Sequence, residues 1–286
     1  MIVVTGATGG LGNGVVRGLL ARGVPAGEVV AAVRAPEKAA DLAALGVTVR
    51  HADYDRPETL EPAFAGAAKL LLVSSVGTDE VRLAQHRAVL AAAGRAGVRL
   101  LAYTSLVEAD TNPLGLAGTH RATERAIAES GLPHVLLRNG WYTENYLWRL
   151  PAAVARGELL GSGGEGRVAA AARADFAEAA AEVLTLDDQA GRVYELTGDT
   201  AWTAAELAAE AAAATGRPVA YRDIPGEEYA ATLAAAGLPP FAVDLFVDAD
   251  LRVSEGALAT VSDDLAKLLG RPTTPLAASV AAALAD

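Results

Sequence analysis

The sequence predicts an α/β protein with a Rossmann-type doubly wound parallel sheet and a smaller, mostly helical C-terminal lid. The chain opens on an apolar strand that leads directly into a Gly-x-x-Gly-x-x-Gly loop and then into an amphipathic helix. Further apolar runs alternate with helical patterns along the chain, which is typical of a parallel sheet covered by helices on both faces. The fold class is predicted from these two observations, the glycine loop and the alternation of apolar runs with helical patterns.

The expected strands are short runs rich in Val, Leu and Ala. They cover 2–5, 28–34, 47–52, 69–75, 98–104 and 134–138, and a seventh strand near 193–198 is expected to return to the same sheet. Amphipathic helices are expected at 12–22, about 58–65, 79–95 and 118–130. Two later patterns, Asp175 to Glu178 and Thr203 to Glu206, resemble capping boxes at helix starts.

The glycine loop between the first strand and the first helix predicts a dinucleotide site. Gly6 permits the tight turn, Gly9 lets backbone N–H groups approach a pyrophosphate, and Gly12 lets the helix lie close to the strand. The helix N-terminus would then face the phosphates with its partial positive charge. The alternative is a glycine-rich turn without a ligand. The residues expected to contact the dinucleotide here are Gly6, Ala7, Thr8, Gly9, Gly10, Leu11 and Gly12.

This loop assigns residues 1–140 to a dinucleotide-binding domain, to which the strand near 193–198 returns. Residues 141–286 are expected to form mostly the substrate lid. An aromatic cluster precedes a glycine-rich loop in this part, and the rest is largely helical with scattered prolines.

Composition excludes several functional classes. The 286 residues carry a formal net charge of −11 without a basic run, so no nucleic-acid partner is expected. There is no cysteine, and the four histidines lack metal-ligand spacing, so no metal site is expected. Met1 leads directly into the first strand and no apolar run reaches the roughly 18 residues of a membrane helix, so we expect a cytoplasmic protein without membrane association. A homo-oligomer is compatible with the sequence, which does not decide the oligomeric state.

The end of the second strand selects the cofactor. An acid there would bind the ribose 2′-hydroxyl of NAD, whereas an arginine accommodates the 2′-phosphate of NADP. Arg34 ends this strand, Lys38 follows one turn later, and Glu28 lies at the opposite end. NADP(H) is therefore preferred over NAD(H), although Arg34 as a solvated surface charge is the alternative. Asp53 is a candidate for the adenine amine, and Val73, Ser74 and Ser75 are expected to border the nicotinamide half.

The usual proton donor of such folds is missing. The glycine spacing and Tyr103-Thr104-Ser105 at the end of the fifth strand resemble the extended short-chain dehydrogenase/reductase superfamily. Most of its enzymes use Tyr-x-x-x-Lys, in which the lysine lowers the pKa of the tyrosine. The chain contains no such motif and only three lysines, and the corresponding helix contains His120 and Glu124 one turn apart. These two side chains are either a site pair or a surface pair. His51, His86 and His134 are interpreted as structural.

Several segments resemble the NmrA-like, atypical branch of this superfamily, and within it the resemblance is closest to bacterial NAD(P)H:quinone oxidoreductases. The segments are Gln85-His86, residues 103–106 and 109–117, His120, Glu124, residues 137–146 with Leu-Arg-Asn-Gly-Trp-Tyr, Arg173 to Asp175, and Val193 to Leu196. The resemblance implies that the glycine loop and Arg34 hold the nucleotide and that residues 139–145 line its nicotinamide and substrate end. Candidate contacts there are Asn139, Gly140, Trp141, Tyr142, Asn145 and Tyr146, with Arg173 as a possible anchor for cofactor or substrate.

The resemblance implies NADPH-dependent reduction of quinones or similar planar acceptors. Hydride transfer to a quinone produces a delocalised anion that water can protonate, so positioning matters more than a general acid. No catalytic residue is assigned; Asn139, Trp141, Tyr142, Tyr146 and His120 are candidates for the substrate pocket. The aromatic side chains would form a flat wall for the acceptor or simply pack in the lid. The alternative function is a non-catalytic NADP-binding redox sensor of the NmrA type, for which the missing dyad is the support.

Overall fold

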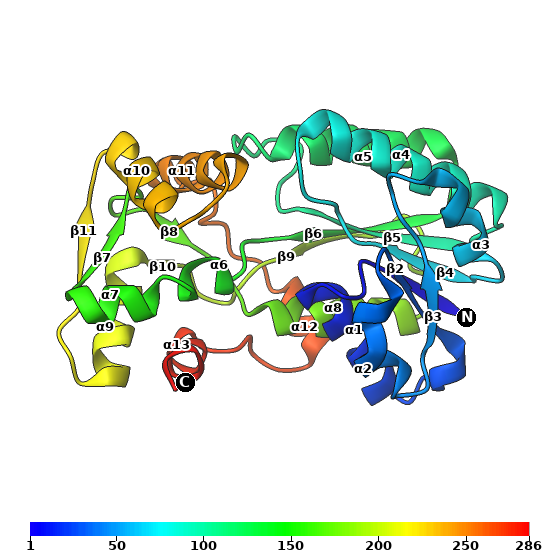
Figure 1. The fold of residues 1–286 in the computed structure, drawn as a ribbon, viewed down its shortest axis with the longest axis horizontal. Helices are drawn as coiled ribbons and strands as arrows, with labels where there is room; N and C mark the ends of the chain where they lie inside the picture. The colour runs from blue at the N-terminus through cyan, green and yellow to red at the C-terminus, as the bar shows by residue number, and fades with distance from the viewer. Residues whose placement is uncertain (286) are drawn as a thin grey trace. The chain divides into compact units, whose positions relative to one another are not determined.

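The chain forms two compact units in the computed structural model, which describes residues 1–285 (Figure 1). The first unit comprises residues 1–110, 118–139 and 174–195, and the second comprises residues 111–117, 140–173 and 196–286. Each unit has its own sheets and helices, and each is described separately below.

A seven-stranded sheet forms the centre of the first unit. Its strands lie in the order β3-β2-β1-β4-β5-β6-β9, and every pairing from β3 to β6 is parallel. The bounds are β1 Ile2–Thr5, β2 Val29–Val33, β3 Thr48–His51, β4 Lys69–Leu72, β5 Leu100–Leu106, β6 His134–Asn139 and β9 Val193–Leu196. The predicted fold class and all seven strands are confirmed. Strands β2 and β5 are buried throughout. Strand β2 is wholly apolar, and β5 is apolar except for Thr104 and Ser105, whose hydroxyls form hydrogen bonds.

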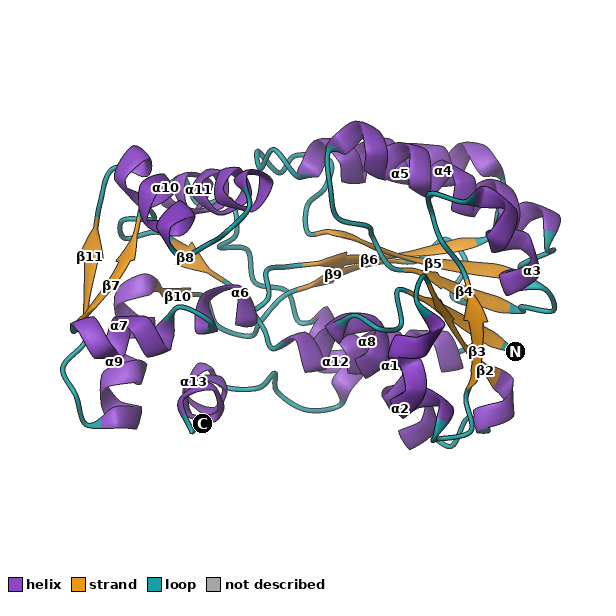
Figure 2. Ribbon diagram, in the orientation of Figure 1, coloured by secondary structure: helices purple, strands orange, loops and turns teal. Residues whose placement is uncertain are grey.

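Helices cover both faces of this sheet. Figure 2 shows α3, α4 and α5 on one face and α1, α2 and α8 on the other. The bounds are α1 Gly10–Ala21, α2 Ala40–Ala43, α3 Leu60–Phe64, α4 Asp79–Arg95, α5 Ala117–Ser130 and α8 Arg173–Thr185, with short 3₁₀ turns at Ala26–Glu28, Pro36–Ala39 and Pro57–Thr59. The side chains of Phe64, Leu70, Val89 and Ile127 are fully buried in the core between the sheet and the first of these helical layers.

Two glycines let α1 and α8 approach closely. A Cβ atom added to Gly14 would lie 2.8 Å from the Cβ of Ala177, and one added to Gly18 would lie 2.9 Å from the Cβ of Ala181. These separations are too short for real Cβ contacts, so both glycines are needed for this packing. The predicted capping box at Asp175 is wrong because α8 begins two residues earlier, at Arg173, which places Asp175 inside the buried first turn.

The second unit contains two small sheets and several helices. Strands β7 Glu158–Gly161 and β11 Ala220–Asp223 pair in parallel, and β8 Arg167–Val168 pairs antiparallel with β10 Trp202–Thr203. The helices are α6 Glu144–Leu147, α7 Leu150–Arg156, α9 Ala204–Thr215, α10 Gly226–Ala235, α11 Pro240–Ser254, α12 Asp264–Leu269 and α13 Leu276–Leu284. The predicted capping box of α9 is confirmed: the Glu206 N–H donates to Thr203 Oγ1 at 3.1 Å, and the Thr203 N–H donates to Glu206 Oε2 at 2.7 Å.

The compact units differ from the predicted domains in three places. Residues 174–195, which contain α8 and most of β9, belong to the first unit, whereas residues 111–117 and Gly140 belong to the second. The domain boundary at residue 140 therefore remains a prediction about function rather than a description of these units. Within residues 1–285, no helix has the length and apolar character needed to span a bilayer.

Candidate active site

The strand order changes direction between β1 and β4. From β1, the chain builds outward through β2 and β3 on one side, and through β4, β5 and β6 on the other. Ligands of open α/β sheets bind beyond the carboxyl ends of the strands at such a switch point. The glycine loop after β1 and residues 73–75 after β4 flank this point, and a Cβ atom on Gly6 would lie 3.5 Å from the Cβ of Val73. We refer to this place as the crevice.

The glycine loop has a conformation that side chains would disturb. Gly6 has φ +59°, in the left-handed region, and its carbonyl accepts the Gly9 N–H at 2.9 Å. A Cβ atom on Gly12 would lie 2.5 Å from Gly6 O, whereas one on Gly9 would lie 3.3 Å from the same oxygen. Gly12 is thus required by packing, and Gly9 is required only if something must approach the loop.

The start of α1 fits a phosphate group. Gly9 is the N-cap residue and no side chain caps the helix, so the first-turn N–H groups lack a side-chain acceptor. Thr8, Gly9 and Gly10 are exposed, while Ala7 and Leu11 are buried. Leu11 can therefore contribute only its backbone. These features match the cradle that the sequence predicts.

Arg34 and Lys38 lie beyond the carboxyl end of β2. Both side chains are exposed, and neither makes a hydrogen bond or ion pair among residues 1–285. Glu28 is in the turn that precedes β2, at the opposite end of the strand. Asp53 follows β3 and is half-buried, and its carboxylate already accepts the Asp55 N–H at 3.1 Å. Glu37 lies between the two cations, in the 3₁₀ turn Pro36–Ala39, and is also exposed, but the first side chain after β2 is the cation Arg34 rather than an acid.

Distant side chains hold the segment after β4. The N–H groups of Val73, Ser74 and Ser75 donate, in that order, to Thr5 Oγ1 at 3.0 Å, Thr104 Oγ1 at 2.8 Å and His86 Nε2 at 3.0 Å. The expected strand 69–75 ends at Leu72 because these three amides bond side chains instead of a neighbouring strand.

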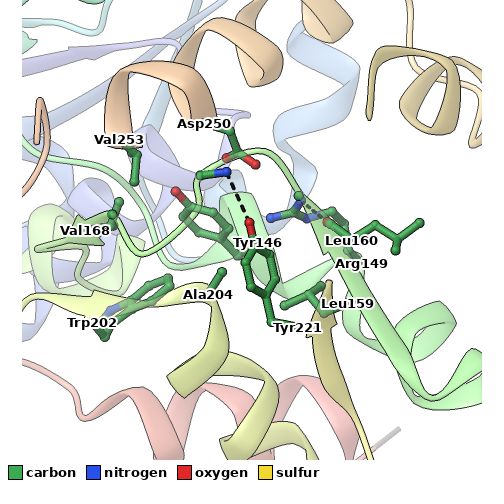
Figure 3. Close-up of a pocket in the computed structure, with 13 residues that line it drawn as sticks. Tyr146, Arg149, Leu159, Leu160, Val168, Trp202, Ala204, Tyr221, Asp250 and Val253 are labelled. Carbon is green, nitrogen blue, oxygen red and sulfur yellow. Dashed lines mark hydrogen bonds between the residues drawn. The ribbon is translucent and has the colours of Figure 1, made fainter. Parts of the chain in front are cut away.

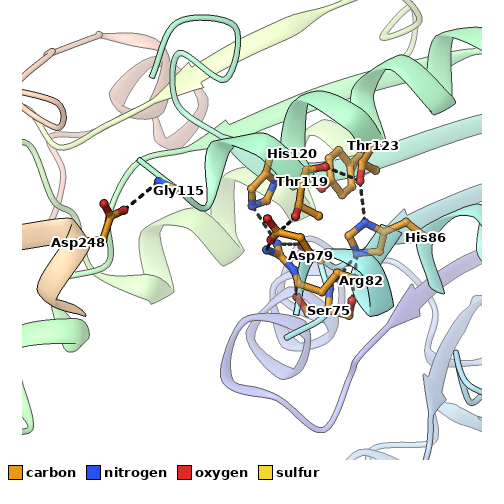
Figure 4. A network of polar contacts seen from close by, with 11 residues as sticks. Ser75, Asp79, Arg82, His86, Gly115, Thr119, His120, Thr123 and Asp248 are labelled. Carbon is orange, nitrogen blue, oxygen red and sulfur yellow. Dashed lines mark hydrogen bonds and ion pairs between the residues drawn. The ribbon is translucent and has the colours of Figure 1, made fainter. Parts of the chain in front are cut away.

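Arg82 of α4 lies at the centre of a buried polar network under this segment (Figure 4). Its Nε donates to Ser75 O at 2.8 Å, and one terminal nitrogen lies 3.0 Å from Ser74 Oγ and 3.2 Å from His120 Nε2. Since arginine can only donate, His120 Nε2 accepts and its proton is on Nδ1, 2.9 Å from the Tyr103 hydroxyl. Both nitrogens of His120 are therefore committed within the first unit.

Burial keeps the histidines of this network neutral. Desolvation, followed by the positive charge of Arg82, lowers the pKa of His86 to about 3 and that of His120 well below its usual value. Desolvation also raises the pKa of Tyr103 to about 12. The expectation that His86 is structural agrees with this environment, and His120 cannot serve as a protonated acid near neutral pH.

We expect the buried His86 to make stability depend on pH. The unfolded chain would bind a proton at a pKa near 6.5 and the folded protein only near 3, so stability is present above pH 6.5 and is lost as the pH falls toward 3. Between pH 8 and pH 5 the loss from this residue should be about 2 kcal/mol. The free energy of unfolding, measured with urea at several pH values, should depend less steeply on pH in His86→Gln than in wild type. The pH dependence of the free energy of unfolding should not change in His51→Gln, because His51 is exposed.

His120 and Glu124 are not a surface pair, because both are buried. Their side chains belong to different hydrogen-bond networks, and a role of either residue in the site stays a prediction. Glu124 accepts hydrogen bonds from Ser105 Oγ and from Arg138, whose guanidinium lies 2.6 Å from it. Arg138 also contacts Asp110 at 2.8 Å and Glu195 at 3.0 Å. Its hydrogen bonds with Glu124 and the other two carboxylates raise its pKa above the usual value.

The predicted substrate segment divides into buried and half-buried side chains. Trp141 and Tyr146 are buried in the second unit, where the Tyr146 and Trp202 rings meet edge to face at 5.1 Å. Tyr142 is half-buried, with the Arg173 guanidinium 5.2 Å from its ring centre. For Tyr146 the packing alternative agrees with the structure, whereas Tyr142 keeps an accessible surface.

Backbone hydrogen bonds hold two of the other residues of the predicted substrate segment, Asn139 and Gly140. Gly140 donates to Leu196 O at 2.6 Å, and a Cβ atom on it would lie 3.0 Å from that oxygen. Asn139 is buried in the first unit and its carbonyl accepts the Val107 N–H at 2.9 Å, while Asn145 is half-buried.

A small cavity lies within the second unit and is lined by Tyr146, Arg149, Tyr221 and Asp250 among others (Figure 3). Its volume of about 20 Å³ is room for about one water molecule, so it is too small for a quinone. Arg149 Nε is buried there without a hydrogen-bond partner among the described residues. Burial raises the pKa of Asp250, whose Oδ2 accepts the Ser162 N–H at 3.1 Å.

The sequence analysis did not identify Arg82 or Arg138 as partners of the site. A signal for Arg82 exists: Arg82, His86, Val89 and Ala93 recur at helical spacing, so a cation and a histidine share the apolar stripe of α4. Arg138 is the single charge within an otherwise apolar strand pattern. Among residues 1–285, no group of three or more His, Asp or Glu side chains is placed to hold a metal.

Comparisons with known proteins agree with this geometry. Residues 6–187 match the model of an NAD(P)H-binding family. The chain is 49% identical to quinone oxidoreductase 2 of Escherichia coli strain K12 over 98% of this chain and 97% of that protein. It also resembles the crystal structure of the NADPH-dependent quinone oxidoreductase 2 of Escherichia coli complexed with NADPH, with a TM-score of 0.94, 49% identity and 99% of each chain covered.

A second similar protein is the triphenylmethane reductase of Citrobacter sp., whose crystal structure is complexed with NADP(H). Its TM-score is 0.95 at 39% identity, with 99% of this chain and all of that chain covered. The family resemblance found in the sequence is thereby confirmed. The chain belongs to the NAD(P)H-binding family that the model describes, together with quinone oxidoreductase 2.

Proposed function

We propose that this chain is an NADPH-dependent oxidoreductase that reduces quinones or similar planar acceptors by hydride transfer. The cofactor assignment rests on the uncapped start of α1 beside Gly6 and on the exposed cation Arg34, which is the first residue after β2 where an NAD site would have an acid. The acceptor class comes from the family: the relative with 49% identity is a quinone oxidoreductase, and its structure was determined with NADPH.

When bound, NADPH supplies the hydride. The backbone of Gly6 to Gly12 would hold the pyrophosphate, Arg34 with Lys38 would hold the 2′-phosphate, and Val73 to Ser75 would border the nicotinamide half. Asp53 would face the adenine. Arg82, His86, Thr5 and Thr104 fix the Val73 to Ser75 segment from behind, so this wall is ordered before any ligand arrives.

The chain's own residues leave the proton to water. No Tyr-x-x-x-Lys occurs, and His120 is neutral with both ring nitrogens committed. A reduced quinone carries a delocalised charge and does not need an adjacent acid, in contrast to the alkoxide formed from a ketone. Residues proposed to contact the nicotinamide or the acceptor are Asn139, Gly140, Trp141, Tyr142, Asn145 and Arg173, whereas Tyr146 packs against Trp202.

Catalytic oxidation of NADPH by a quinone distinguishes the proposed oxidoreductase from a non-catalytic NADP-binding redox sensor. The protein is mixed with NADPH and a benzoquinone, and the loss of nicotinamide absorbance is followed. Catalytic oxidation of many equivalents of NADPH supports the proposal. Tight NADPH binding without turnover of any quinone tested would favour the NADP-binding redox sensor instead.

Arg34 should determine the preference for the phosphorylated cofactor. A charge-assisted contact between arginine and phosphate contributes about 1.5–3 kcal/mol. Arg34→Ala should therefore weaken NADPH binding by roughly ten- to hundredfold and leave NADH nearly unchanged. Titration of each cofactor by nicotinamide fluorescence measures this, and Arg17→Ala, an exposed change on α1, is the control. Equal losses for both cofactors would refute the assignment.

Removal of either candidate acid should have a small effect. His120→Ala and Tyr142→Phe are each expected to keep quinone turnover at saturating NADPH within about tenfold of wild type, because loss of a true general acid costs about 10²–10⁴-fold. Trp141→Ala should reduce turnover more, through loss of positioning. A drop beyond a hundredfold in Tyr142→Phe, with folding and NADPH binding intact, would show that a protein acid takes part.

A further inference from the structure

Arg82 is a buried cation with little compensation from carboxylates. Its side chain is 4% exposed, and its close partners, Ser74, Ser75 and His120, are neutral. The nearest carboxylate oxygen, Asp79 Oδ1, is 3.9 Å from Nη1, and the Asp79 side chain is 68% exposed. Asp79 also accepts a hydrogen bond from Thr119. Solvent therefore screens the negative charge while the positive charge remains buried.

Arg138, a largely buried arginine of the first unit, shows the contrast. Arg138 is surrounded by Glu124, Asp110 and Glu195 at 2.6–3.0 Å, so its charge is more than neutralised. A buried cation without such a partner costs free energy. The buried positive charge of Arg82 therefore needs a functional explanation, whereas the charge of Arg138 is explained by its three carboxylate partners.

The charge of Arg82 lies directly behind one wall of the crevice. Its Nε bonds Ser75 O and a terminal nitrogen bonds Ser74 Oγ, both in the segment after β4. The adenosine side of the crevice is at β2, where Arg34 is, so β4 is on the nicotinamide side. The nicotinamide ring is neutral in NADPH and carries a positive charge in NADP⁺.

We propose that the buried charge of Arg82 makes the site bind NADPH more tightly than NADP⁺. Repulsion acts only on the oxidised ring, so it disfavours the product of hydride transfer and promotes its release. Two unit charges about 10 Å apart at an effective dielectric of about 20 interact strongly enough to change a dissociation constant by about tenfold. This inference rests on the proposed use of NADPH, and the experiment below separates the two.

The test is the ratio of the dissociation constants for NADP⁺ and NADPH, measured by calorimetry. Wild type should favour NADPH, and Arg82→Gln should reduce the ratio by about tenfold. Arg82→Lys, which keeps the charge, should retain most of the ratio. Arg87→Gln removes an exposed charge from the same helix and should leave the ratio unchanged. A purely structural role for Arg82 would weaken both cofactors equally.

Each failure has a separate meaning. Wild-type protein that binds neither cofactor would refute the proposed function. Wild-type protein that binds NADPH and NADP⁺ with equal affinity would refute only the role of Arg82 and would leave the proposed function intact. Equal weakening of NADPH and NADP⁺ in Arg82→Gln would also refute the role of Arg82. Should Arg82→Gln fail to fold, Asp79→Asn provides a weaker test of opposite sign: because solvent already screens this carboxylate, its removal should increase the ratio by less than tenfold, and a decrease in the ratio would refute the role of Arg82.

Discussion

Gly9→Val should abolish NADPH binding while leaving the protein folded. The residue has φ −83° and ψ 161°, an extended conformation that valine adopts readily, and its Cβ would meet only Gly6 O at 3.3 Å. The branched side chain would instead occupy the space in which a pyrophosphate approaches the first-turn amides of α1. Calorimetric titration should show at least a hundredfold loss of affinity, with thermal unfolding near that of wild type.

Gly12→Ala and Gly94→Ala are the matched controls. A Cβ on Gly12 would lie 2.5 Å from Gly6 O, so this variant should lose stability through overpacking, by about 1–3 kcal/mol. Nothing lies within 4 Å of a Cβ on Gly94, so that variant should keep both stability and affinity. A folded Gly9→Val variant with unchanged NADPH affinity would exclude the loop as the phosphate site.

Arg138→Met should cause one of the largest losses of stability that a single substitution can produce in the first unit. It would leave the Glu124 side chain, which is 9% exposed, as an unpaired buried carboxylate. Loss of one member of a buried ion pair typically costs about 3–5 kcal/mol. Urea unfolding followed by circular dichroism should show this decrease in the free energy of unfolding.

Two variants show whether the buried charge is the cause. Combining Arg138→Met with Glu124→Gln should recover part of the loss, because an uncharged amide is cheaper to bury than a carboxylate. Arg56→Met breaks the exposed pair with Glu58 and should change stability by less than about 1 kcal/mol. An Arg138→Met effect as small as that of Arg56→Met would contradict the structural interpretation.

The sheet could be predicted from the sequence because its strands are buried on both faces. Apolar runs such as Val29–Val33 and residues 100–103 stand out from the helices between them. The end of β4 could not be predicted from the sequence, because the backbone N–H groups of residues 73–75 donate to side chains that are up to 68 positions away. The strands of β8 and β10 have two residues each, which is too short for any periodic pattern.

The glycine loop and Arg34 could be located because local spacing alone defines them. His120 and Glu124 show the limit of such reasoning. They share a helical face one turn apart, but His120 reaches Tyr103 of β5 whereas Glu124 reaches Arg138 of β6. Their partners depend on how α5 crosses the two strands, which spacing along α5 does not reveal.

The return of residues 174–195 to the first unit has a consequence for synthesis on the ribosome. Helix α8, which packs against Gly14 and Gly18 of α1, and most of strand β9 are translated after residues 140–173 of the second unit. The nascent chain therefore cannot close the nucleotide-binding half when residue 139 emerges. Part of the sheet face that α1 and α2 share with α8 stays uncovered for roughly 50 further residues, which takes a few seconds at the usual rate of elongation. A protein shortened at residue 140 should share this defect permanently and aggregate rather than bind a cofactor.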